Sequence, residues 1–311
     1  MNRTIVLRKI LIGLWCCACW TTAHASNAAS VTASPLNCRA SRSEQRTIET
    51  TLADVPAIVR LPMKTTLPPI ILWHGFGPPA SEQALMTALP LDDVPAIKVY
   101  LGLPMFGARM HARGMDEIAE RQKKDVGTLV FAPVVMGAAE ELANVVHALG
   151  DAGCLDPQDG VGLFGFSAGG ASTLLALADR KVNIKAAVTL NASTGLSASV
   201  AAFERAVQQP YIWTPASRAL ADRSDAVKRA ADITAGNPPP ALLIIHGERD
   251  QMLPPRTASD LYDSLLPLYE RAAAPSRLQL ALVPDVAHAW ADSPSGDPLR
   301  ARISQWFRQH L

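Results

Sequence analysis

The sequence predicts an α/β domain in which short buried strands alternate with helices, giving a mostly parallel central sheet with helices on both faces. Short apolar runs recur along the chain, the segments between them show helical spacing, and a glycine-flanked serine stands where one run turns into a helix. The length of 311 residues allows one large α/β domain or two small ones. We expect a single domain over residues 44–311.

The composition supports a sizeable core and narrows the choice of partners. Hydrophobic residues make up 49% of the chain but aromatic residues only 5%, so Ala, Leu, Val and Ile must form most of the core. The formal net charge is +1 and no basic stripe stands out, which argues against nucleic acid as a partner. The oligomeric state is not encoded in any recognisable pattern.

The first 25 residues have the layout of a secretory signal peptide. Basic residues lead, an uncharged apolar run follows at 10–20, and the small-residue motif at 23–25 predicts cleavage after Ala25. The apolar run is too short for a comfortable membrane span, so we expect no stable span after cleavage. The sequence therefore predicts export to the periplasm or the medium. Lipid attachment stays open because the segment also contains Cys16, Cys17 and Cys19.

Loss of the signal peptide leaves two of the five cysteines, Cys38 and Cys154. In an oxidising compartment these can form a disulfide between the start of the mature chain and the segment before the serine motif. The alternative is two separate buried thiols. Residues 26–43 are small and polar, and we expect a loose arm there.

The expected strands follow from β-branched content and apolar runs. Residues 44–61 indicate two strands before a proline-containing turn. Buried strands are expected after it at 69–73, 96–101, 160–164, 184–190, 241–245 and 278–283. Helices are expected at 138–149, at 171–178 and at the C-terminal end, where apolar residues follow helical spacing.

The segment between residues 190 and 238 departs from this alternation because it contains no evident strand. Helices are expected at 199–207 and 216–233, joined by a connector at 208–215. An insertion of this kind at 196–237 could form a helical cap over a site at the C-terminal edge of the sheet. Two ordinary crossover helices are an equal alternative.

The G-x-S-x-G motif at 165–169 places Ser167 between the strand at 160–164 and the helix at 171–178. A serine at such a turn is typical of a nucleophile elbow, in which flanking glycines permit a turn too tight for side chains. The backbone N–H of Ala168 would then lie at the helix start and face a developing oxyanion. The alternative is a glycine-rich turn with Ser167 as the N-cap.

A serine nucleophile needs a base, and the base needs an acid that orients it. In this architecture the acid follows the serine in the chain and lies in a loop after a strand. Asp250 follows the strand at 241–245 and meets both conditions. Glu248 is a rival acid, but it lies closer to the strand end, so we favour Asp250.

The base is expected at His288, in the loop after the strand at 278–283. A histidine accepts and returns a proton near neutral pH. After Asp250 only His310 competes for this role, and it lies at the C-terminal end of the chain. The alternative for His288 is a solvent-facing loop residue.

The loop after the strand at 69–73 should supply the second oxyanion donor, for which we choose the Phe76 N–H. His74 precedes the serine in the chain and is expected to be structural. Besides Phe76, three aromatic side chains near these loops are candidates for an apolar acyl pocket, although such residues are more often plain core: Phe106, Trp213 and Trp290.

These motifs together resemble the α/β-hydrolase superfamily over residues 44–311. The matching segments are His74-Gly75-Phe76-Gly77, Gly165 to Gly170, His246-Gly247-Glu248-Arg249-Asp250 and Ala287-His288. The chain is most similar to the dienelactone hydrolase and prolyl-oligopeptidase-like esterases. Dienelactone hydrolases usually carry a cysteine where Ser167 stands, and prolyl oligopeptidases carry a propeller for which this chain has no room.

The resemblance implies a serine hydrolase that works through an acyl-enzyme, without a metal or another cofactor. We expect it to cleave small-molecule carboxylic esters outside the cytoplasm. A peptidase or amidase with the same triad is the first alternative. A non-catalytic binding protein of the same fold is the second, although Ser167, Asp250 and His288 are all present. The fold does not fix the substrate.

Overall fold

The computed structural model describes residues 36–39, 43–156 and 158–311. The predicted signal peptide at 1–25 and most of the predicted arm lie outside these residues. The described chain confirms the α/β prediction, with a single sheet of eight strands. They are β1 (Arg46–Leu52), β2 (Val55–Leu61), β3 (Ile70–Trp73), β4 (Lys98–Leu101), β5 (Val161–Phe166), β6 (Ile184–Leu190), β7 (Ala241–Gly247) and β8 (Leu278–Val283).

The strands lie in the order β1-β2-β4-β3-β5-β6-β7-β8. Strand β2 pairs antiparallel with both β1 and β4, whereas every pairing from β4 to β8 is parallel. Because parallel strands end at the same edge, the loops that follow β3, β5, β6, β7 and β8 are brought to one edge of the sheet. The element order therefore gathers loops that are far apart in the sequence.

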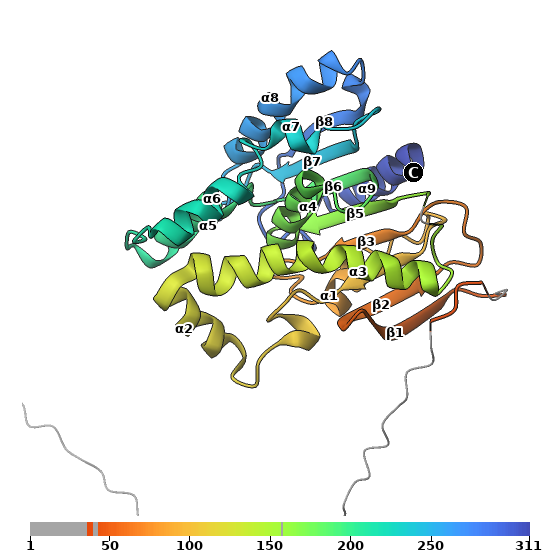
Figure 1. Cartoon of the computed structure of the whole chain (residues 1–311), viewed down its shortest axis with the longest axis horizontal. Helices are drawn as coiled ribbons and strands as arrows, with labels where there is room; N and C mark the ends of the chain where they lie inside the picture. Colours follow the sequence, from red (N-terminus) through yellow and green to blue (C-terminus); the bar gives the residue numbers. More distant parts are fainter. Residues whose placement is uncertain (1–35, 40–42, 157) are drawn as a thin grey trace, which may run out of the picture. The chain divides into compact units, whose positions relative to one another are not determined.

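Helices cover both faces of the sheet (Figure 1). They are α1 (Glu82–Ala88), α2 (Gly114–Val126), α3 (Gly137–Asp151), α4 (Ala168–Asp179), α5 (Leu196–Val207), α6 (Pro215–Ser224), α7 (Ala230–Ile233), α8 (Arg256–Arg271) and α9 (Gly296–His310).

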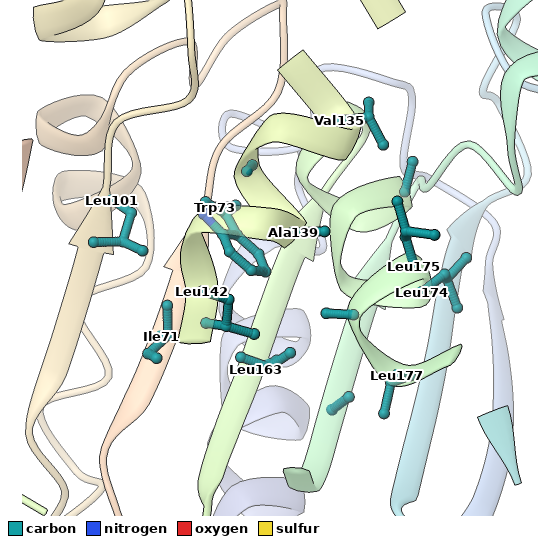
Figure 2. Packing of buried hydrophobic residues seen from close by; sticks show 14 of the residues in the cluster. Ile71, Trp73, Leu101, Val135, Ala139, Leu142, Leu163, Leu174, Leu175 and Leu177 are labelled. Atoms are coloured by element: carbon teal, nitrogen blue, oxygen red, sulfur yellow. The ribbon is translucent and has the colours of Figure 1, made fainter. Parts of the chain in front are cut away.

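Two hydrophobic clusters lie on the two faces, which explains why the strands read as continuous apolar runs. In β3, Ile71 and Trp73 belong to one cluster, and Ile70 and Leu72 to the other. Figure 2 shows the first cluster, to which β3, β5, α3 and α4 all contribute side chains, with Leu142 of α3 beside Ile71. Both faces of β3 are thus buried, and the strand holds the loop after it rigidly.

A π-helical segment, η2 (Gly127–Met136), joins α2 to α3 and contains Pro133. Asp125, at the end of α2, has non-helical backbone angles that kink the run. Among the described residues, one helical run, Gly114–Asp151, is long and apolar enough to cross a membrane by length and composition. Half of its most apolar window (50%) is buried in the domain, which fits a core helix.

The segment between β6 and β7 contains helices α5, α6 and α7, in agreement with the lack of a predicted strand there. Helices α5 and α6 extend past the arrowhead ends of the neighbouring strands (Figure 1). The expected helix at 216–233 is interrupted, because α6 ends at Ser224 and Asp225 has extended backbone angles. The Asp225 side chain accepts the N–H groups of Val227 and Lys228, which builds a turn instead.

A disulfide joins Cys38 to Cys154 with an S–S distance of 2.00 Å. The Cys38 N–H also donates to the Ala152 carbonyl at 3.0 Å, so backbone and side chain both tie residue 38 to the turn after α3. The bond spans a sequence separation of 116 residues. The sequence predicts this pairing, because Cys38 and Cys154 are the two cysteines outside the predicted signal peptide.

Removal of this disulfide should lower the free energy of unfolding by about 2–4 kcal/mol, because the cross-link restricts the unfolded chain. The measurement is urea unfolding of the wild type and of the double variant Cys38→Ser/Cys154→Ser. Alkylation and mass spectrometry, before and after reduction, verify that the wild-type thiols are paired. Indistinguishable unfolding curves for the two proteins would contradict a stabilising cross-link.

Candidate active site

Three side chains from separate loops form one hydrogen-bonded series. The Nε2 atom of His288 lies 3.0 Å from the Ser167 hydroxyl, and its Nδ1 atom lies 2.7 Å from Oδ2 of Asp250. Ser167 stands between β5 and α4, Asp250 after β7 and His288 after β8. The structure therefore brings together the serine, base and acid that the sequence predicts.

Ser167 has a left-handed backbone conformation, with φ 53° and ψ −114°. Such a conformation is strained for a residue with a side chain, and the surrounding backbone holds it in place. Its N–H donates to the Leu190 carbonyl at 3.0 Å, and its hydroxyl makes no N-capping bond to α4. The hydroxyl faces His288, so the N-cap alternative does not describe this serine.

The glycines of the motif permit very close backbone contacts. A Cβ atom at Gly165 would lie 2.2 Å from the Gly169 carbonyl oxygen, and one at Gly169 would lie 2.5 Å from the His74 carbonyl oxygen. At Gly170 it would lie 2.4 Å from the Ala192 side chain. The sharp turn at Ser167 therefore requires glycine at these positions.

Asp250 is nearly fully buried, with 4% of its surface exposed. Burial raises the pKa of its carboxyl group, but hydrogen bonds from His246, His288 and the Leu253 N–H outweigh burial and hold the pKa well below its ordinary value. Oδ1 accepts the N–H groups of Met252 and Leu253, both at 2.8 Å. The rival acid, Glu248, is exposed.

His246 contacts the same carboxylate, a role that sequence reasoning missed. Its Nε2 atom donates to the Leu253 carbonyl at 2.8 Å and lies 3.3 Å from Oδ2 of Asp250. The residue is the penultimate one of β7 and only 1% exposed. A polar residue at the end of an otherwise apolar strand, four positions before the acid, was the available signal.

The loop after β3 lies against the serine. A Cβ atom at Gly75 would lie 2.8 Å from Cβ of Ser167, and the Gly169 N–H donates to the His74 carbonyl at 3.1 Å. The Ala168 N–H is the first of α4 and has no acceptor within the helix. In the described part of the chain, neither this N–H nor that of Phe76 has a hydrogen-bond acceptor.

His74 is fully buried and holds the loop after β3 in place. Burial lowers its pKa to about 4, so the imidazole is neutral at physiological pH. Its Nδ1 atom donates to the Gly75 carbonyl at 2.8 Å, while its Nε2 atom accepts the Leu103 N–H at 3.2 Å. These contacts fit the structural role expected for this residue.

The three pocket candidates occupy different environments. Phe106 is 1% exposed and stacks on Phe76, with ring centroids 4.6 Å apart. Trp290 has no exposed surface and packs edge-to-face with Phe166 in the second core cluster, so it does not line an open pocket. Trp213 is half-buried in the α5–α6 connector, against the ring of Tyr211.

The α5–α6 segment borders the site through polar contacts. Nη2 of Arg205, in α5, donates to the Met252 carbonyl at 2.7 Å, two residues after the predicted acid. On the other side, the Tyr211 hydroxyl donates to Asp125 at the end of α2. The segment is thus tied both to the acid loop and to the kinked helix.

Stability should fall as the pH drops from about 6.5 toward 4, because the unfolded state binds a proton at His74 that the folded state excludes. His74 then contributes a slope of up to about 1.4 kcal/mol per pH unit. The non-titrating variant His74→Gln keeps a donor and an acceptor and should show a shallower slope. The measurement is urea unfolding of both proteins at pH 7.5, 6 and 5 (roughly spanning the titration). Equal slopes would contradict the assignment.

Comparison with solved structures shows the α/β-hydrolase fold. TT1662 from Thermus thermophilus is 19% identical, with a TM-score of 0.61, over 85% of this chain and 98% of that chain. Carboxyl esterase 2 from the mycorrhizal fungus Tuber melanosporum is 20% identical, with a TM-score of 0.57, over 87% of both chains. Dipeptidyl peptidase 4 of Porphyromonas gingivalis is 16% identical, with a TM-score of 0.60, over 86% of this chain and 35% of that chain.

No curated protein matches the sequence. The family model of the prolyl oligopeptidase family does match, over residues 137–311. This region contains β5 to β8 and the loops that carry Ser167, Asp250 and His288. Because the match covers more than half of the chain, the protein belongs to the prolyl oligopeptidase family and is a hydrolase.

Proposed function

We propose that the protein is an exported serine hydrolase that cleaves carboxylic esters, with Ser167 as nucleophile, His288 as general base and Asp250 as the orienting acid. The observation that carries this proposal is the continuous hydrogen-bonded series from the Ser167 hydroxyl through His288 to Asp250. A strained serine with its hydroxyl on an imidazole is the geometry that acyl transfer requires.

In the first half of the reaction, the Ser167 oxygen attacks the acyl carbon while its proton passes to Nε2 of His288. Asp250 accepts the Nδ1–H bond and stabilises the charged imidazolium. The backbone N–H groups of Phe76 and Ala168 donate to the oxyanion. His288 then returns the proton to the leaving alcohol, which departs and leaves an acyl-enzyme.

In the second half, a water molecule replaces the alcohol. His288 takes a proton from the water as its oxygen attacks the acyl carbon, and the same N–H groups stabilise the second tetrahedral intermediate. Collapse of this intermediate releases the carboxylic acid, and His288 returns the proton to Ser167. Every proton in the two halves of the reaction thus moves between Ser167, His288, the leaving alcohol and the attacking water.

An ester substrate is supported by the similarity to carboxyl esterase 2, with which the chain aligns over 87% of both lengths. Amide cleavage by the same series is the second candidate, which the match to the prolyl oligopeptidase family favours. Export is supported by the Cys38–Cys154 disulfide, because such bonds persist in oxidising compartments.

Ser167→Ala should lose nearly all hydrolysis, because no other group can form the acyl-enzyme. The substrates are a p-nitrophenyl ester and the p-nitroanilide of the same short acyl group, assayed with wild type and variant. We expect the ester to be cleaved at least about 100-fold faster by kcat/KM. Circular dichroism verifies that the variant is folded.

A fluorophosphonate probe tests the nucleophile independently of the substrate, and it should label wild type but not Ser167→Ala. Faster cleavage of the anilide would replace the ester proposal with the amidase. Labelling without turnover of either substrate would leave the nucleophile assignment intact but refute this substrate class. Folded wild-type protein that takes no label would favour the non-catalytic binding protein.

Gly75→Ala should reduce kcat by about 100-fold or more, because a Cβ atom there would lie 2.8 Å from Cβ of Ser167 and 2.9 Å from the Phe166 ring. Relief of this clash would move the loop that carries the Phe76 N–H away from the serine and the oxyanion. Gly77→Ala is the matched control, since no heavy atom lies within 4 Å of a Cβ atom at that position. It should retain wild-type kcat and KM. Equal activity of the two variants would contradict the placement of the oxyanion donor in this loop.

A further inference from the structure

Residues 190–193, at the end of β6 and directly after it, contact the loops of all three proposed catalytic residues. The Leu190 carbonyl accepts the Ser167 N–H at 3.0 Å, and the Ser193 N–H donates to the Ser167 carbonyl at 3.3 Å. Asn191, between them, contacts the other two loops. This segment therefore connects the turn of the nucleophile with the loops of the acid and the base.

The carboxamide of Asn191 makes three hydrogen bonds. Its Oδ1 atom accepts the Gly247 N–H at 2.7 Å, at the end of β7. Its Nδ2 atom donates to the carbonyls of Ala287 and His288, at 2.8 and 3.1 Å. One planar group thus fixes the start of the acid loop relative to the backbone of the base.

Asn191 is fully buried and has a φ of 46°. Asparagine tolerates this left-handed conformation better than most residues with a side chain. Its own N–H donates to the Ile245 carbonyl at 3.0 Å, which fixes the backbone from which the carboxamide extends. The Asn191 N–H and both ends of its carboxamide are hydrogen-bonded, so the carboxamide has one orientation.

The carbonyls of the base loop are held by two different groups. The Arg249 N–H holds the carbonyl of Val286 at 3.0 Å, whereas Asn191 holds the next two carbonyls, including that of His288 itself. Without Asn191 the loop would stay attached through Val286. The two residues that place the imidazole would lose their anchor.

We propose that Asn191 is a positioning residue that holds His288 within hydrogen-bonding distance of both Ser167 and Asp250. The proposal rests on the function proposed above, because it assumes that His288 is the base. A shift of the imidazole by about 1 Å is enough to lower the rate of acyl transfer greatly. Among the described residues, the Asn191 carboxamide hydrogen-bonds to backbone groups only, so it acts through His288 and not on the substrate.

Two variants of Asn191 test whether its Nδ2 donor, and not the rest of its side chain, positions the base. Asn191→Asp preserves the shape and the acceptor for Gly247 but places oxygen against the carbonyls of Ala287 and His288. Asn191→Gly removes the carboxamide and tolerates the left-handed backbone. Asn183→Asp is the matched control, because Asn183 is exposed and precedes the same strand that Asn191 follows.

The experiment measures the rate constant of fluorophosphonate labelling at Ser167, and kcat and KM on the p-nitrophenyl ester. Both Asn191 variants should label and turn over about 10- to 100-fold more slowly with KM unchanged, whereas Asn183→Asp stays within about two-fold of wild type. The proton NMR resonance of the His288 Nδ1–H bond to Asp250 should shift or disappear only in the Asn191 variants.

Labelling at the wild-type rate by folded Asn191→Asp and Asn191→Gly would overturn the proposal, as would a raised KM at unchanged kcat. Thermal unfolding reports whether each variant is folded at the assay temperature. If one is not, the other decides. If neither folds, Asn191 serves stability and the proposal fails. A wild type that takes no label refutes the proposed function itself, which is a separate outcome.

Discussion

The left-handed backbone of Ser167 is the constraint on which the rest of the site depends. A residue with a side chain is strained at φ 53°, and close contacts with the surrounding backbone hold Ser167 in this conformation. Gly165, Gly169 and Gly170 lack side chains because carbonyls or Ala192 occupy the space that a Cβ atom would need. Gly75, far earlier in the chain, obeys the same requirement because it faces Cβ of Ser167.

The sheet supplies the rigidity that this strain needs. Strands β3, β5, β6 and β7 are buried along their whole length apart from Lys185, with apolar clusters on both faces. The loops that follow these strands therefore start from fixed positions. A few hydrogen bonds between the loops are then enough to align the proposed catalytic groups. The neutral, buried imidazole of His74 and the carboxamide of Asn191 are two such contacts, one on each side of β5.

Much of this could be predicted from the sequence because it depends on local patterns. Apolar runs bounded by glycine and proline located the strands, and the chain order of Ser167, Asp250 and His288 selected side chains that do meet. The predicted signal cleavage leaves two cysteines, and these two are paired in the structure. Each of these inferences uses residue type and spacing alone.

The features that were missed depend on tertiary contacts. The π-helical segment η2 carries no clear helical period, because nearly all of its residues are apolar and it contains Pro133. Asn191 directly follows an apolar strand, and nothing in its spacing tells that its side chain reaches the acid and base loops. His246 ends an apolar strand four residues before Asp250, a spacing that indicates its proximity to the acid but not the contact itself. The break at Asp225 is local instead, because its side chain accepts the N–H groups of Val227 and Lys228 and builds a turn that competes with the helix.

The disulfide divides the molecule in a way that its position in the sequence does not suggest. The covalent ring from Cys38 to Cys154 encloses β1 to β4, which occupy one half of the sheet, and leaves β5 to β8 outside in the other half. The boundary runs between β3 and β5, directly beneath the site. Of the two proposed oxyanion donors, Phe76 belongs to the ring and Ala168 to the open part of the chain. The two proposed oxyanion donors would therefore come from opposite sides of this boundary, one from the disulfide-closed loop and one from the chain that follows it.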